Sequence, residues 1–117
     1  MLTVVGYHAT ASLVKIWESY LTPEGKVKKE VIAYLEELGA YYFMPVTGGY
    51  GRSGVPDIVA CLYGHFVGIE CKAGNNQPTA LQEKNLRAIR SAGGLSFCVN
   101  SVKVLREQLE SDFERLE

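Results

Sequence analysis

Apolar residues recur every three to four positions in four segments of the chain, which predicts four amphipathic helices. The first predicted helix spans residues 9 to 20. In the second, Thr22 can cap the N-terminus, Pro23 suits the first turn, and Gly39 can supply a left-handed stop. A third helix should begin at Thr79, and a fourth near Ser101. The stripes expected to face the core in the last three helices are Val27, Val31, Tyr34, Leu35 and Leu38; Leu81, Leu86 and Ile89; and Val102, Leu105, Leu109, Phe113 and Leu116.

Four shorter segments are rich in β-branched, aromatic and other apolar residues, which predicts strands over 41–46, 58–63, 66–73 and 95–99. Between the second and third strands, Gly64 and His65 are expected to form the two-residue loop of a β-hairpin. The main elements then follow the order helix, three strands, helix, strand, helix. This order predicts an α/β fold.

Composition limits the possible functions without selecting one. A chain of 117 residues suits one compact domain, and its net charge of −1 means that any nucleic-acid surface must be a local patch. We expect a cytoplasmic protein that does not span a membrane, because its apolar runs are too short. The three cysteines lack metal-site spacing and are expected to be reduced core residues, at positions Cys61, Cys71 and Cys98.

Three charged residues at one end of the predicted hairpin need an explanation. If Tyr63 pairs with Phe66, Asp57 lies opposite Lys72 and diagonal to Glu70, with diagonal Cβ atoms about 7 to 8 Å apart on one face. Two carboxylates this close repel unless a cation lies between them, and oxygen ligands suit a hard ion such as Mg²⁺. A surface ion pair between Asp57 and Lys72 is the alternative. Geometry alone leaves both interpretations open.

The sequence around these charges resembles a known family. Glu70 and Lys72, in "GIECKAG", follow the "VPD" of Asp57 in the pattern of the PD-(D/E)xK nucleases. With "SGVPDIV" and "QPTALQEKNLRAIRSAGG", the chain looks like the VRR-NUC branch over roughly residues 23–105. The resemblance implies a restriction-endonuclease-like αβββαβ core with a mixed sheet flanked by helices. We therefore divide the chain into a helical extension (1–22) and a nuclease domain (23–117).

The resemblance also implies roles for individual residues. Asp57 and Glu70 would bind Mg²⁺ or Mn²⁺, the backbone carbonyl of Cys71 would complete the metal shell, and Lys72 would serve the attacking water. Glu30 matches the acidic residue of the family's first helix, although an exposed helix glutamate is the alternative. Gln82 matches a helix glutamine of the family, and its role stays open because Thr79 and Gln82 also fit a capping box.

Basic residues near these positions are candidates for binding nucleic acid. Arg52 lies on the glycine-rich loop before Asp57 and could hold a phosphate, and solvated positions are the alternative for every basic candidate. The helical candidates are Lys26, Lys29, Lys84, Arg87 and Arg90.

Together these features predict a Mg²⁺-dependent DNA endonuclease, and the resemblance implies products with a 5′-phosphate and a 3′-hydroxyl. A noncatalytic nucleic-acid-binding module with the same fold is the rival hypothesis. One small domain has little surface for selecting a substrate, so we expect a homodimer that prefers branched DNA such as four-way junctions. The candidate dimer surface consists of aromatic residues, for each of which core packing is the alternative role. They are Trp17, Tyr20, Tyr41, Tyr42 and Phe43.

Overall fold

The structure, a computed structural model of the chain, describes residues 21–46 and 51–116. The predicted helix over residues 9–20, with Trp17 and Tyr20, lies outside the described residues. The N-terminal helical extension therefore stays a prediction.

The three helices of the described chain begin directly after their predicted capping residues, and the first two of them end just before the predicted glycines. Helix α2 spans Pro23–Glu37, α3 spans Ala80–Ser91 and α4 spans Val102–Leu116. At the start of α2, the hydroxyl oxygen of Thr22 accepts a hydrogen bond from the Gly25 N–H at 3.0 Å. Gly39 follows α2 with a φ of +75°, the left-handed conformation that ends many helices. Over these ranges the chain has no helix with both the length and the apolar character needed to cross a bilayer.

Four strands form one mixed sheet in the order β1-β2-β3-β4. Strand β1 spans Tyr41–Phe43, β2 Ile58–Leu62, β3 His65–Cys71 and β4 Leu95–Val99. The pairs β1–β2 and β2–β3 are antiparallel, whereas β3 and β4 are parallel and are connected through α3. The predicted α/β fold with a mixed sheet flanked by helices is confirmed, although β1 ends three residues earlier than the predicted Val46.

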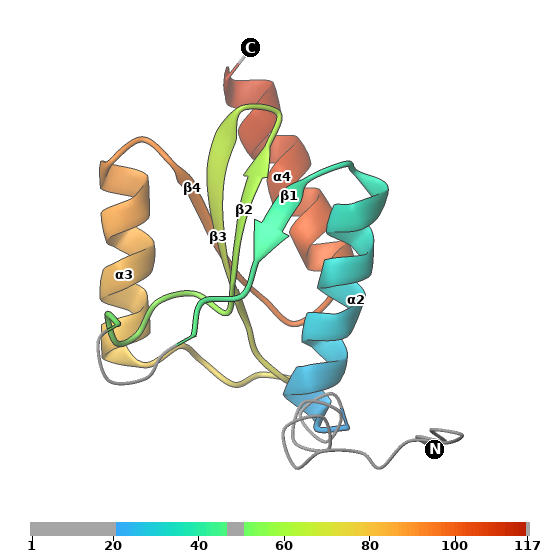
Figure 1. The fold of residues 1–117 in the computed structure, drawn as a ribbon, viewed down its shortest axis with the longest axis vertical. Coiled ribbons are helices and arrows are strands. Elements are labelled where there is room, and N and C mark those ends of the chain that lie inside the picture. Colours follow the sequence, from blue (N-terminus) through green and yellow to red (C-terminus); the bar gives the residue numbers. More distant parts are fainter. Residues whose placement is uncertain (1–20, 47–50, 117) are drawn as a thin grey trace, which may run out of the picture.

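Helices cover the two faces of the sheet unequally (Figure 1). Helices α2 and α4 contact each other and cover one face, and α3 packs against β3 and β4 on the other. The main core lies on the α2/α4 face, where Val31 and Leu35 of α2 and Leu105 of α4 are fully buried. The sheet residues of this core are Ile58, Ala60, Leu62, Val67, Ile69, Cys71, Leu95, Phe97 and Val99.

The face covered by α3 corrects two predictions. Leu81, expected in the core, is 46% exposed, while Asn85 is the buried residue of α3. Cys61, expected to be a core cysteine, is exposed. Helix α3 packs mainly against β3 and β4, so Cys61 of β2 is left exposed on this face, although Val59 of the same strand is buried.

The hairpin turn differs from the predicted one by one position. Leu62 pairs with His65, so the loop residues are Tyr63 and Gly64, with φ of 50° and 82°. Positive φ at both positions is the pattern of a type I′ turn, whose twist matches that of the flanking strands. Continuing this register places Asp57 opposite Glu70 rather than Lys72. The pairing shifts by two residues, so the side chains keep their predicted face.

Candidate metal centre

Three carboxylates converge at one end of the sheet. Glu24 belongs to the first turn of α2, Asp57 precedes β2, and Glu70 lies near the end of β3. One carboxylate oxygen from each lies within 4.8 Å of the other two. The N-terminal ends of α2 and α3 lie at the same end of the sheet (Figure 1). Helix N-termini carry partial positive charge, so they stabilise negatively charged groups at this end of the sheet.

Glu70 occupies the most buried position of the three. Only 1% of the residue is exposed, and its Oε1 accepts a hydrogen bond from Gln82 Nε2 at 2.9 Å. The other oxygen, Oε2, is buried without a hydrogen-bond partner among the described residues. Burial and the neighbouring Asp57 carboxylate raise the pKa of Glu70 to about 7. A buried carboxylate oxygen without a hydrogen-bond partner, on a residue beside other carboxylates, is the feature expected of a cation ligand.

Asp57 is held by the backbone of the neighbouring strand. Its Oδ2 accepts a hydrogen bond from the Cys71 N–H at 2.9 Å, and its Oδ1 lies 3.8 Å from Lys28 Nζ. The Cys71 side chain points into the α2/α4 core, and burial raises the pKa of its thiol. Cys71 therefore positions Asp57 through its amide, and a role for its carbonyl in binding metal stays a prediction.

Lys72 lies among the acids rather than at the surface. Its Nζ is 3.8 Å from Glu24 Oε1 and 3.8 Å from Glu70 Oε1, and only 15% of its side chain is exposed. The backbone N–H of Lys72 donates to the Val99 carbonyl at 2.9 Å, which continues the β3–β4 pairing past Cys71. The simple surface ion pair between Asp57 and Lys72 does not describe this arrangement, because Lys72 contacts the other two acids and Lys28 contacts Asp57.

Gln82 combines the two roles that the sequence leaves open. Its side-chain Oε1 accepts a hydrogen bond from the backbone N–H of Thr79 at 2.9 Å. Its backbone N–H donates to Thr79 Oγ1 at 3.2 Å, which completes a capping box. Its Nε2 donates to Glu70 Oε1. The capping box therefore fixes the Gln82 side-chain amide through its oxygen. The nitrogen of the same amide holds Glu70, so Gln82 positions an acid of the cluster.

The structure brings Glu24, not Glu30, to the cluster. Glu30 is exposed on α2 and does not belong to the acidic group. Glu24, Lys28 and Val31 are spaced by four and three residues, so they share one helical face, and Val31 is fully buried. Sequence reasoning missed Glu24 because an acid in the first turn is explained by the helix dipole alone. Its spacing from Lys28 and Val31 was the available signal.

The predicted basic residues of α2 are not the ones at the site. Lys26 and Lys29 are exposed, and the lysine that reaches the cluster is Lys28, which was not among the candidates. Lys28 lies one turn after Glu24 on the same face. Lys26 and Lys29 remain available on the surface for long-range attraction of a polyanion.

The basic residues of α3 divide into surface and structural positions. Lys84 and Arg87 are exposed, and Arg87 lies 3.9 Å from Glu83. Arg90, also a predicted DNA contact, is instead a structural residue. Its Nη2 donates to buried Asp112 at 3.0 Å, and its guanidinium lies 5.1 Å from the centroid of the Phe97 ring. These contacts join α3 to β4 and α4.

The segment leading into Asp57 is fastened to α3. Asn85 Nδ2 donates to the Ser53 carbonyl at 3.2 Å and to the Leu81 carbonyl at 2.9 Å. Gly54, with φ of +75°, lies so close that a Cβ there would be 2.5 Å from Leu81 Cγ. Arg52, the predicted phosphate contact, lines a cleft of about 350 Å³ with Phe66 and Ile89. Buried Asn85 thus positions the loop before Asp57, a role that the sequence pattern did not reveal.

The donor set fits a hard divalent cation. Three carboxylates and two ammonium groups, from Lys28 and Lys72, leave a net negative charge when Glu70 is ionised. Oxygen ligands of one Mg²⁺ lie roughly 3.0 Å apart when adjacent and about 4.2 Å apart when opposite, so the three acids would have to draw closer together to share an ion. The unpartnered Oε2 of Glu70 gives that ion a ligand that the protein does not otherwise use.

Comparisons with known proteins agree with this fold. The chain is similar to a solved VRR_NUC domain, with 31% sequence identity and a TM-score of 0.65 over 76% of this chain and 96% of that one. It also resembles the fold of Hjc, a Holliday junction resolvase from the archaeal hyperthermophile Archaeoglobus fulgidus, at 19% identity and a TM-score of 0.50, covering 65% of this chain and 66% of that one. No protein-family model and no curated protein matches the chain.

Proposed function

Because the chain belongs to the VRR-NUC family of PD-(D/E)xK nucleases, we propose that it is a Mg²⁺- or Mn²⁺-dependent DNA endonuclease. The observation that carries this proposal is the convergence of Glu24, Asp57 and Glu70 on one point, with Lys72 3.8 Å from two of them. Glu70 is buried beside the partly buried Asp57, and a buried carboxylate next to a second one is costly for a fold to keep, so its retention favours a function that uses it.

A bound divalent ion would polarise the scissile phosphate and lower the pKa of a bound water. The chain supplies the remaining steps. Asp57, Glu70 and Glu24 would hold the ion, and the Lys72 ammonium group would donate hydrogen bonds to the attacking water or to a phosphate oxygen. The two helix N-termini add partial positive charge where the phosphate's negative charge develops. Gln82 keeps Glu70 in place through the hydrogen bond from its Nε2.

Two clefts flank the cluster and offer a path for a DNA strand. One, of about 460 Å³, is lined by Lys28, Asp57 and Gln82. The other, of about 480 Å³, is lined by Lys72, which lies 3.8 Å from Glu24 and from Glu70. A strand that enters one cleft and leaves by the other would place a phosphodiester at the carboxylates.

We further propose a homodimer that selects branched DNA such as four-way junctions. On the sheet face that α3 leaves open, Tyr41 is 75% exposed, and Phe43 and Phe66 are each 51% exposed. For Tyr41 and Phe43 the alternative of core packing therefore fails, and they offer apolar area for a second copy. Tyr42 is not part of this surface, because it packs on the other face and its hydroxyl donates to Glu36 at 2.6 Å. Light scattering of wild type and Tyr41→Ser/Phe43→Ser would test the dimer, with a wild-type monomer refuting it.

The central test is cleavage of duplex, nicked, single-stranded and four-way DNA with Mg²⁺, Mn²⁺ or chelator. We expect metal-dependent cutting, fastest on the branched substrate, and its loss in Asp57→Ala, Glu70→Ala and Lys72→Ala. Full activity in any of these variants would refute the assigned roles. Equal cutting of linear and branched DNA would refute only the substrate preference.

The rival binding module makes a different prediction for metal binding. An ion that binds only the folded state stabilises it by about 2.7 kcal/mol at a hundred times its dissociation constant. We expect Mg²⁺ or Mn²⁺ to raise the melting temperature of wild type but much less that of Asp57→Ala. DNA binding without cleavage and without this difference would support the binding module instead.

A further inference from the structure

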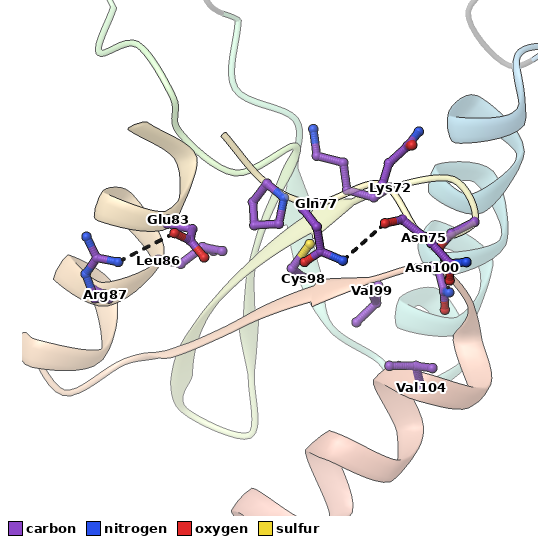
Figure 2. Close-up of a pocket in the computed structure, with 13 residues that line it drawn as sticks. Lys72, Asn75, Gln77, Glu83, Leu86, Arg87, Cys98, Val99, Asn100 and Val104 are labelled. Atoms are coloured by element: carbon purple, nitrogen blue, oxygen red, sulfur yellow. Dashed lines mark hydrogen bonds and ion pairs between the residues drawn. The ribbon is translucent and has the colours of Figure 1, made fainter. Parts of the chain in front are cut away.

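The cleft beside Lys72 has lining chemistry that metal binding does not require. It has a volume of about 480 Å³, within the range of sites for small organic ligands. Figure 2 shows Gln77 and Cys98 between the Glu83–Arg87 pair of α3 and Asn100 before α4. The cleft therefore lies between the segment after β3, the N-terminal part of α3 and the end of β4.

Amide groups dominate the polar lining. Asn75, Asn76, Gln77 and Asn100 all line the cleft. Gln77 Nε2 donates to the backbone carbonyl of Asn75 at 3.1 Å, and Asn100 Nδ2 donates to the backbone carbonyl of Gly74 at 2.9 Å. These bonds fix how the two side chains point. Their carbonyl oxygens accept no hydrogen bond from the described residues, so the cleft presents both amide acceptors and amide donors.

The rest of the lining is apolar or electrically balanced. Leu86, Val99 and Val104 contribute aliphatic surface, and Arg87 is paired with Glu83 at 3.9 Å. Lys72 is the other cation among the lining residues. Its acidic partners, Glu24 and Glu70, do not line the cleft. Such a lining is unsuited to a phosphate. It suits a planar heterocycle with donors and acceptors at its edge and apolar faces, which describes a nucleobase.

We propose that this cleft binds an unpaired nucleobase attached to the phosphodiester held at the acidic cluster. The inference rests on the proposed nuclease function, and it deepens that function by naming the substrate feature that the site selects. Lys72 borders the cleft and lies 3.8 Å from Glu70, so a base in the cleft and a phosphate at the acids are neighbouring parts of one nucleotide. A base stacked and paired within a duplex presents neither its faces nor its pairing edge to such a cleft.

The physical consequence is selection for DNA in which the nucleotide at the cut is already unstacked. Extracting a paired base costs a few kcal/mol, whereas a base at a branch point or in a single strand has lost part of that stabilisation. The cleft would therefore favour branched or single-stranded DNA over linear duplex without reading a long sequence.

A fluorescence experiment in chelator separates base binding from cleavage. Four-way DNA would carry 2-aminopurine, whose emission rises on unstacking, at each position around the branch point in turn. We expect wild-type protein to raise the emission at one position, and Gln77→Ala and Asn76→Ala to reduce that rise at least about threefold. Gln108→Ala, an exposed glutamine on α4 away from the cleft, is the matched control and should behave like wild type. Both cleft residues are exposed, so these variants should fold.

The second measurement uses DNA with an abasic residue at each position flanking the mapped cut. Because a hydrogen bond to the amide lining contributes about 1 kcal/mol, an abasic residue at the position read by the cleft should lower kcat/KM roughly fivefold or more. Normal cutting with no rise in emission and no abasic effect would overturn the inference and leave the nuclease intact. A rise in emission that persists in both cleft variants would also overturn it. A rise that Gln77→Ala removes, without cutting in either metal, would support the cleft and refute the proposed nuclease.

Discussion

Replacing Glu70 by glutamine should stabilise the metal-free protein at alkaline pH. Burial and Asp57 raise the pKa of Glu70 from 4.5 to about 7, so the folded chain binds this proton more tightly than the unfolded chain. A raised pKa contributes stability that is full below pH 4.5 and is lost as the pH rises through 7. Each pKa unit corresponds to about 1.4 kcal/mol, so wild type should lose about 2 to 3 kcal/mol relative to the variant between pH 5 and pH 8.

Glutamine is a close test of this charge. It keeps an oxygen that can accept from Gln82 Nε2, and its own amide can donate to the Asp57 carboxylate. Urea unfolding in chelator at pH 5, 6, 7 and 8 would measure the difference. In thermal melts the gap between the two proteins should widen by roughly 10 °C over this range. Glu110→Gln, an exposed glutamate on α4, is the control and should track wild type at every pH.

Two results would contradict the reasoning. If Glu70→Gln and wild type keep a constant difference in unfolding free energy from pH 5 to pH 8, Glu70 is not the titrating group. If saturating Mg²⁺ or Mn²⁺ stabilises Glu70→Gln as much as wild type, the ion does not use the Glu70 carboxylate.

Three further predictions follow from individual contacts. Glu24→Gln should lower cleavage at least about tenfold and weaken metal-induced stabilisation, whereas Glu30→Gln should do neither; the reverse pattern in the same cleavage assay would restore Glu30 as the helix acid. Asn85→Asp should cost about 1 to 3 kcal/mol of unfolding free energy and speed hydrogen exchange at residues 51–57, because the Ser53 and Leu81 carbonyls lose their donor; unchanged exchange would show that Asn85 does not hold the loop. Arg90→Met should destabilise the fold by about 2 kcal/mol in urea, because buried Asp112 loses a partner, and should leave the salt dependence of DNA binding unchanged; a shallower salt slope would identify Arg90 as a phosphate contact.

Local sequence patterns determined the order of elements and the face of the sheet that carries the site. Thr22, Pro23 and Gly39 mark the ends of α2 because caps act within a few residues of a helix terminus. Strand residues alternate between faces, so Glu70 and Lys72 had to share one. The predicted hairpin register was wrong by two residues, yet Asp57 kept its face because a two-residue shift preserves the alternation.

Residues whose roles depend on distant parts of the chain were decided only by tertiary structure. The sequence favoured Glu30, but the direction in which α2 crosses the sheet places Glu24 beside Asp57 and Glu70. Leu81 fits the apolar stripe of α3, yet Leu81 is exposed, and Asn85 is the residue buried against the loop before Asp57. Arg90 pairs with Asp112, 22 residues away. Helical periodicity gives the direction in which a side chain points around the axis of its helix. These contacts depend instead on where the helix axis lies relative to the sheet, which is set by packing between elements far apart in the sequence.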